Sequence, residues 1–181
     1  IDYRHEDLSG NVGNPAELFG EPGVDDDGNG YIDDIYGWNF INGTNQIEAD
    51  DHGTHVAGTI GAENNNGVGV CGNGGNTGVW LLSCQLFGTI DGREVSASFP
   101  EMIKYAADAG AVIAQNSWGY ENITYLPRAD QEAIDYFIQY AGVDERGEQT
   151  GPMKGGVVIF AAGNENKDYR TYPAAYEKVV S

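Results

Sequence analysis

The sequence AVIAQNS at residues 111–117 has the length and apolar content of a short buried β-strand. A helical pattern lies on each side of this stretch along the chain. Before it, Ser98 supplies a helix-start signal, apolar residues follow at helical spacing, and Gly110 ends the segment. After it, residues 129–141 again place apolar side chains on one helix face. The stretch is therefore expected to be a strand between two helices.

Two further apolar runs extend this pattern in both directions. VWLLSCQLF at residues 79–87 and GVVIFAA at residues 156–162 are both strand candidates. The order strand, helix, strand, helix, strand predicts an α/β fold, a parallel β-sheet flanked by helices. Because ligands bind beyond the carboxyl ends of the strands in such sheets, we expect functional residues at 117–119 and 163–165.

Length and composition exclude several classes of protein. The chain has 181 residues, 40% of them hydrophobic, which suits a single domain with an apolar core. No apolar run approaches the ~18 residues of a membrane-spanning helix. A net charge of -19 argues against a nucleic-acid or anionic-membrane partner. Two cysteines, Cys71 and Cys84, allow either one disulfide bridge or two thiols.

The negative charge is concentrated in the first half of the chain. Between Arg4 and Arg93 there is no Lys or Arg, yet this stretch holds 14 Asp and Glu residues. Carboxylates at this density repel one another unless a cation neutralises them. The stretch is either a solvated acidic face or a region that binds hard cations such as calcium.

Residues 25–34, DDDGNGYIDD, form the strongest local pattern and predict a calcium-binding loop. Oxygen side chains at alternate positions, a glycine at the sixth position and an inward backbone carbonyl follow the logic of an EF-hand loop. The twelfth position is Tyr36 instead of a bidentate Glu, so an aspartate would have to close the shell. The alternative is an Asx-rich surface turn. The predicted ligands are Asp25, Asp27, Asn29, Tyr31 and Asp33 or Asp34.

The segment DHGTHVAGT at residues 51–59 holds two of the three histidines of the chain. A short helix is expected from His55 to Ala62. His52 at its mouth would be a general base, with His55 packed in the core. Alternatively, the two histidines bind a metal, although no HExxH pattern supplies a further ligand position.

The end of the last strand carries small residues followed by an asparagine. Ala161, Ala162 and Gly163 would let a substrate approach the backbone closely. The carboxamide of Asn164 at this edge would donate a hydrogen bond to a developing oxyanion. The alternative is an asparagine that adopts positive φ in a turn.

Taken together, HGTHVAGT at 52–59, SWG at 117–119 and AAGNE at 161–165 resemble the subtilisin-like serine proteases, the subtilases. The likeness covers essentially the whole chain in the same order. It implies that His52 is the general base of a Ser–His–Asp triad and that Asn164 supplies the oxyanion hole. It also implies that Ser117–Gly119 pair with the substrate main chain and that Ala161–Gly163 form a wall of the specificity pocket. An opposite substrate-pairing strand is implied near Asp91–Glu94. The substrate-binding residues implied are Ser117, Trp118, Gly119, Ala161, Ala162 and Gly163.

The resemblance also implies a second calcium site. The segment IDYRHEDL at residues 1–8 is similar to the one after the family's Asp-(Thr/Ser)-Gly motif. Asp7 matches a carboxylate that ligates calcium in many members. Asn65 matches the loop of the same site, although this loop is shorter here.

Two motifs of the family do not occur in these 181 residues. Neither Asp-(Thr/Ser)-Gly nor Gly-Thr-Ser-Met-Ala is present. We therefore expect residues 1–181 to be an internal part of a peptidase domain, with a calcium-loop-like insertion at residues 25–36. This chain alone would be inactive. Removal of the strand that carries the catalytic Asp would favour self-association or a partner segment.

The resemblance implies a secreted or extracytoplasmic endopeptidase that needs calcium and acts on polypeptides. Two alternatives stay open. The chain could be a non-catalytic calcium-binding or peptide-binding module on the same fold. It could also be a metal hydrolase that uses His52 and His55.

Overall fold

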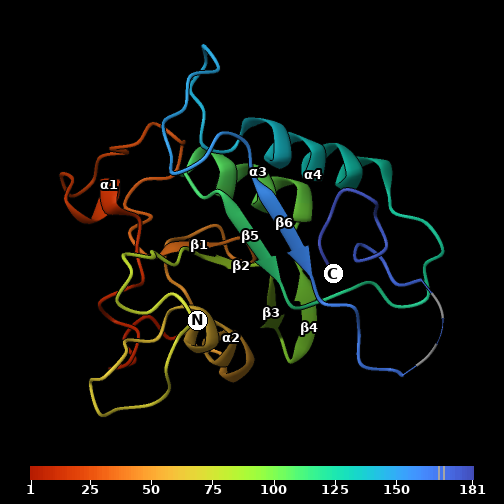
Figure 1. The fold of residues 1–181 in the computed structure, drawn as a ribbon, viewed down its shortest axis with the longest axis horizontal. Coiled ribbons are helices and arrows are strands. Elements are labelled where there is room, and N and C mark those ends of the chain that lie inside the picture. The colour runs from red at the N-terminus through yellow and green to blue at the C-terminus, as the bar shows by residue number, and fades with distance from the viewer. Residues whose placement is uncertain (167, 169) are drawn as a thin grey trace. The chain divides into compact units, whose positions relative to one another are not determined.

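The computed structural model describes residues 1–166, 168 and 170–181 (Figure 1). The chain divides into two compact units, Ile1–Ser98 and Phe99–Ser181. Both units combine helices with strands, and of the three strand pairs among the described residues two are parallel. This agrees with the α/β fold expected from the sequence.

The second unit follows the predicted order of elements. It contains α3 (Phe99–Asp108), β5 (Ile113–Asn116), α4 (Arg128–Tyr140) and β6 (Val157–Phe160). Strands β5 and β6 are parallel, in the register Ile113↔Val157 to Asn116↔Phe160. The predicted helix–strand–helix–strand order is therefore confirmed, with each strand shorter at both ends than its apolar run.

The core of the second unit lies between its two helices and β6. Helix α3 packs against α4, and α4 also contacts β6. The apolar spacing that predicted the helices is the spacing of their buried residues. These buried side chains include Met102, Ile103 and Tyr105 of α3, Ile134 and Phe137 of α4, and Val158 and Phe160 of β6.

The first unit is richer in loops. Its elements are α1 (Pro15–Leu18), β1 (Gly37–Asn39), α2 (Asp51–Gly61), β2 (Ser83–Gln85), β3 (Phe87–Ile90) and β4 (Arg93–Ser96). Strands β1 and β2 are parallel, and an isolated parallel bridge joins Val12 to Leu81. A small core forms from Leu8, Val12, Ala57 and Ala62.

The segment 79–87 differs from the single buried strand predicted for it. Only β2 lies in the parallel pair, and Phe87 already begins an antiparallel hairpin in which β3 pairs with β4. The turn of this hairpin is Asp91–Gly92, and both residues have positive φ, 51° and 75°. Two-residue hairpin turns require such backbone angles, which glycine adopts without strain. The apolar residues at 87–90 therefore belong to a second sheet, and Phe87 is 50% exposed.

Helix α2 begins earlier than the predicted segment at His55. The side chain of Asp50 caps it by accepting a hydrogen bond from the backbone N–H of Gly53 (2.7 Å). An N-cap of this kind satisfies one of the free donors of the first turn. The cap brings His52 into the first turn of the helix.

Candidate active site and acidic loop

His52 lies in the first turn of α2, where its side chain is exposed to solvent. The Asp50 cap fixes the start of this helix. Thr54 in the same turn accepts a hydrogen bond from the backbone N–H of Asp2 (2.7 Å), which ties the chain start to the helix. His52 is thus carried by a defined first turn, and its imidazole is exposed to solvent.

His55 is exposed as well, which contradicts the interpretation that it packs in the core. Its backbone carbonyl accepts a hydrogen bond from the hydroxyl of Thr59 (3.1 Å), an ordinary contact within a helix. Among the described residues, the two histidines belong to no group of three or more metal-ligating side chains.

The segment Ser117–Gly119 continues β5 at the carboxyl end of the strand. Asn116 anchors its start, because the side-chain amide donates hydrogen bonds to the backbone carbonyls of Ala114 and Ile159 (both 3.2 Å). The carboxamide oxygen of Asn116 accepts from the indole Nε1–H of Trp118 (3.2 Å). One buried asparagine therefore joins the two strands and orients the tryptophan that follows.

Aromatic rings surround the side chain of Trp118. Its ring centroid lies 5.2 Å from that of Phe99, 5.3 Å from Tyr120 and 5.2 Å from Phe160, all edge to face. Such geometry suits the ring quadrupoles and adds to the burial of apolar area. These ring contacts pack around the middle residue of the 117–119 segment.

Residues 161–164 leave β6 at the same edge, where all four are exposed. The backbone N–H of Ala161 donates to the carbonyl of Asn116 (2.9 Å), so the parallel pairing extends to this point. Gly163 has a φ of 104°, a region that side chains rarely adopt. The backbone N–H of Asn164 donates to the Glu165 carboxylate (3.0 Å).

The predicted residues of the active site thus fall into two groups. Ser117–Gly119 and Ala161–Asn164 lie together at the carboxyl edge of the β5–β6 pair in the second unit. His52 belongs to the first unit.

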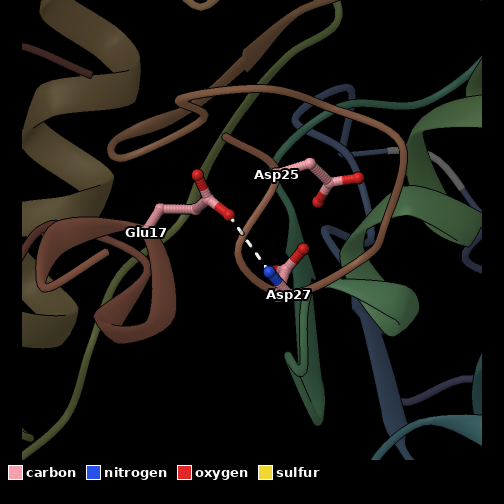
Figure 2. A group of neighbouring side chains, drawn as sticks. All are labelled: Glu17, Asp25 and Asp27. Carbon is pink, nitrogen blue, oxygen red and sulfur yellow. Dashed lines mark hydrogen bonds between the residues drawn. The ribbon is translucent and has the colours of Figure 1, made fainter. Parts of the chain in front are cut away.

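The acidic loop at residues 25–34 brings carboxylates together, and one of them comes from outside the loop. Ligand atoms of Glu17, Asp25 and Asp27 all lie within 4.8 Å of one another. Figure 2 shows Glu17 reaching from α1 toward the two aspartates of the loop. Two of the predicted ligands, Asp25 and Asp27, therefore lie together, and Glu17 lies with them.

The other predicted ligands of the loop take different positions. The carboxamide of Asn29 donates to Asp27 (3.1 Å) and to the buried Asp34 (3.1 Å), so it lies beside the cluster. Asp33 faces away, because its carboxylate accepts from the backbone N–H of Gly23 (2.9 Å). Tyr31 lies between Asn29 and Asp33 in the loop, and its backbone N–H donates to the Asn29 carboxamide oxygen (2.7 Å).

Burial and mutual repulsion disfavour the ionised forms of these carboxyls. Burial raises the pKa of Glu17 and that of Asp27 above their ordinary values. The nearby charge of Asp34 raises both further, while backbone hydrogen bonds act in the opposite direction. A bound cation would relieve this repulsion.

Asp7, the predicted ligand of a second calcium site, is buried and hydrogen bonded. Its carboxylate accepts from the backbone N–H of Val70 (2.8 Å) and from the side-chain amide of Asn66 (2.7 Å). These two hydrogen bonds lower the pKa of Asp7. Asn65 is exposed, with a φ of 65°.

Sequence patterns did not predict that Glu17 lies with the carboxylates of the acidic loop. It lies in a helix of four residues, too short for a periodic apolar signal. The available signal was the N-cap pattern: Asn14 caps α1, Pro15 follows, and an acidic residue occupies the first turn. Nothing in that pattern indicates that the helix faces a loop ten residues further along.

The family model of the subtilases (Peptidase S8) matches residues 1–181. The chain belongs to this family. Subtilisin-like protease 1 of Plasmodium vivax is 51% identical over 79 residues, 42% of this chain and 12% of that protein. A thermophilic serine proteinase of Bacillus sp. (strain AK1) is 29% identical over 182 residues, 100% of this chain and 35% of that protein.

A third relative is the halolysin-like extracellular serine protease Nep of Natrialba magadii, 30% identical over 182 residues. The match covers 100% of this chain and 27% of that protein. The chain thus spans between 12% and 35% of the length of these three relatives. Within the described residues, every helix lacks the length and apolar content required to cross a bilayer.

Proposed function

We propose that these residues form part of the catalytic domain of a secreted serine endopeptidase. The observation that carries the proposal is the register of β5 and β6. It delivers Ser117–Gly119 and Ala161–Asn164 to one exposed sheet edge, where an α/β fold binds its ligand. Family membership and the extracellular relative support the reaction class and the location.

In this proposal the substrate is a polypeptide that lies extended along Ser117–Gly119. His52 accepts the proton of a serine hydroxyl supplied by a segment outside these 181 residues, and later returns it to the leaving amine. The carboxamide of Asn164 donates a hydrogen bond to the oxyanion of the tetrahedral intermediate. The motifs for the serine and the triad aspartate are absent from these residues, so this chain alone is inactive.

A fluorophosphonate probe tests the catalytic role of His52 in the longest natural chain that contains these residues. We expect covalent labelling of that chain, loss of labelling in His52→Ala, and none in the 181-residue chain. His55→Ala is a matched control, because His55 is an exposed histidine on the same helix. Absence of labelling in a well-folded long chain would favour the non-catalytic binding module instead. Equal labelling of the His52→Ala variant would exclude His52 as the base.

We also propose that the acidic loop binds calcium and that Asp7 and Asn65 contribute to a second calcium site. The converging carboxylates of Asp25 and Asp27 support the first site, since hard oxygen donors suit this ion. Calcium bound only to the folded chain would raise the free energy of unfolding by ~2.7 kcal/mol at 100 times its Kd. An excess of chelator should therefore lower the melting temperature. An unchanged melt, together with an unchanged Asp27→Ala melt, would contradict calcium binding by the loop.

We further propose that the 181-residue chain self-associates in solution. Large apolar side chains are exposed on it, among them Ile113 (60%) and Ile90 (50%). Exposed apolar groups and strand edges favour contact with a second chain. Size-exclusion chromatography should show a species larger than 19.4 kDa. A single monomer peak across a tenfold range of concentration would contradict this.

A further inference from the structure

Several asparagines in the first half of the chain are followed directly by glycine. Asparagine is chemically labile, and most so in this dipeptide, because the backbone nitrogen of the next residue can attack the side-chain carbonyl carbon. Glycine has no side chain to obstruct that approach. Whether the reaction occurs in a folded chain depends on whether the glycine N–H is already held in a hydrogen bond. The dipeptides are Asn29-Gly30, Asn42-Gly43, Asn66-Gly67 and Asn73-Gly74.

Hydrogen bonds hold the glycine nitrogen in three of these dipeptides. The N–H of Gly30 donates to a loop carboxylate (2.8 Å), and those of Gly43 and Gly74 donate to backbone carbonyls (2.9 and 2.7 Å). Each of these bonds must break before the nitrogen can attack. Gly67 differs, because its N–H makes no hydrogen bond within the part of the chain that the structure describes, and the residue is exposed.

The carboxamide of Asn66 is held by two hydrogen bonds. Its Oδ1 accepts from the backbone N–H of Val68 (3.0 Å). Negative charge develops on this oxygen when a nucleophile adds to the carbonyl carbon, and a donor already in place stabilises that charge. Its Nδ2 donates to the carboxylate of Asp7 (2.7 Å). Asn66 therefore combines a stabilised carbonyl oxygen with a free nucleophile in the next residue.

We propose that Asn66 is a modification site at which the folded chain deamidates spontaneously. The nitrogen of Gly67 forms a bond to Cγ of Asn66, the Cγ–Nδ2 bond breaks, and ammonia leaves with the proton of the glycine N–H. Water then opens the succinimide ring to aspartate or isoaspartate. The overall change is the exchange of an amide for a carboxylic acid, and it consumes only water. This proposal does not depend on the peptidase function.

The product places a second carboxylate against a buried one. Asp7 is 3% exposed, and it accepts from the backbone N–H of Val70 (2.8 Å) as well as from Asn66. Deamidation replaces the Asn66 donor with a negative charge, so Asp7 loses a hydrogen bond and gains a repulsive neighbour. Both contacts attach residues 66–70 to the chain start. Conversion of Asn66 should therefore loosen this attachment and destabilise the first unit.

Peptide mass mapping tests the proposal in the longest natural chain that contains these residues. The chain carries His52→Ala, so that self-cleavage does not consume it, and is incubated in mildly alkaline buffer with a chelator. The digest is made at acid pH, where the reaction is slow, and is compared with that of a fresh sample. We expect Asn66 to convert at least tenfold faster than the other three asparagines, whose glycine N–H groups must first be released. In urea the four should convert at similar rates.

Two variants test the effect on stability. Asn66→Asp has the charge of the product and should melt below the parent chain. Asn42→Asp is the matched control, because Asn42 is exposed and its Oδ1 accepts from the hydroxyl of Thr44 (2.7 Å), a role that aspartate retains. This control should melt at the temperature of the parent chain.

Three results would overturn the proposal in whole or in part. If Asn66 converts no faster than the other three in the folded chain, the free N–H of Gly67 does not select it. If Asn66 stays intact while the sample in urea converts, the folded loop protects it. If Asn66→Asp and Asn42→Asp both melt with the parent, the new charge does not disturb Asp7, and the predicted loss of stability is wrong.

Discussion

The hydroxyl of Tyr120 donates a hydrogen bond of 2.8 Å to the carboxylate of Asp130, which is only 5% exposed. Tyr120 directly follows the proposed substrate-binding segment Ser117–Gly119, and Asp130 lies in the first turn of α4. The backbone N–H of Tyr120 also donates to the carbonyl of Tyr172 (2.8 Å). The end of the segment is thereby fixed on two sides, by a helix and by a neighbouring chain segment.

The Tyr120–Asp130 pair predicts a specific dependence of stability on pH. Burial raises the pKa of Asp130 above its ordinary value of 3.8, although the hydrogen bond from Tyr120 opposes this. Between 3.8 and the raised pKa, the folded chain holds more protons than the unfolded chain. The contribution of this group to the free energy of unfolding therefore falls as the pH rises. The side chain of the Asp130→Asn variant does not titrate. The free energy of unfolding of this variant should therefore rise relative to that of the wild type as the pH increases across this interval.

Urea unfolding of both proteins at several pH values, from about 3.5 to about 7, measures this difference. The wild-type free energy of unfolding minus that of Asp130→Asn should decrease with pH and then become level. A difference that increases with pH would mean that the pKa of Asp130 is lowered by folding, contrary to its buried environment.

Removal of the tyrosine hydroxyl should destabilise the second unit. Tyr120→Phe leaves the buried carboxylate of Asp130 without this donor, and such a loss costs about 1–3 kcal/mol. Tyr125→Phe is the control, because Tyr125 is 68% exposed, and exposed positions usually change stability by less than ~0.5 kcal/mol. Thermal unfolding of the two variants compares them directly. Equal melting temperatures would show that water replaces the lost hydroxyl at no cost.

The two cysteines should differ sharply in reactivity. Both are free thiols; Cys71 is exposed, whereas Cys84 is partly covered within β2. Burial, with a smaller effect of the nearby Asp34, raises the pKa of Cys84 to about 12. Because the thiolate is the reactive form, a disulfide reagent at about pH 8 should titrate one thiol rapidly and the second only after unfolding. The rapid phase should vanish in Cys71→Ser. Two thiols that react at one rate would contradict the burial of Cys84.

The sequence predicted elements where a single periodic pattern dominates a segment. Helices α3 and α4 were predicted because their buried residues recur at helical spacing, and β6 because an apolar run is bounded by glycines and small residues. The run at residues 79–87 was assigned as one strand of the parallel sheet, but Phe87 belongs to a hairpin, since an apolar run does not reveal whether its partner is a parallel strand or the other half of a hairpin. The turn residues Asp91–Gly92 held that information.

The acidic loop shows a second limit of sequence-based prediction. Asp25 and Asp27 were recognised because ligands of one loop have a fixed spacing along the chain. Glu17 comes from a different element, and its approach to the loop depends on tertiary packing that no local pattern encodes. Asp33 had a suitable spacing, yet its backbone adopts a φ of 53° and its carboxylate binds the N–H of Gly23.

A final prediction concerns Asn116, which is 4% exposed and joins β5 to β6 through its side-chain amide. Asn116→Ala removes both donors to the strand carbonyls and the acceptor for the Trp118 indole. The buried groups left without partners should lower the free energy of unfolding by about 1–3 kcal/mol. Because Trp118 loses the contact that orients its ring, its fluorescence should also change.

Gln115→Ala is the control, since Gln115 is exposed and its side-chain amide donates to the hydroxyl of Ser117 (3.0 Å) within the same short segment. If both variants unfold at the same urea concentration with unchanged fluorescence, the asparagine does not organise this edge, and the placement of Ser117–Gly119 must come from the aromatic cluster around Trp118 and the hydrogen bonds of Tyr120.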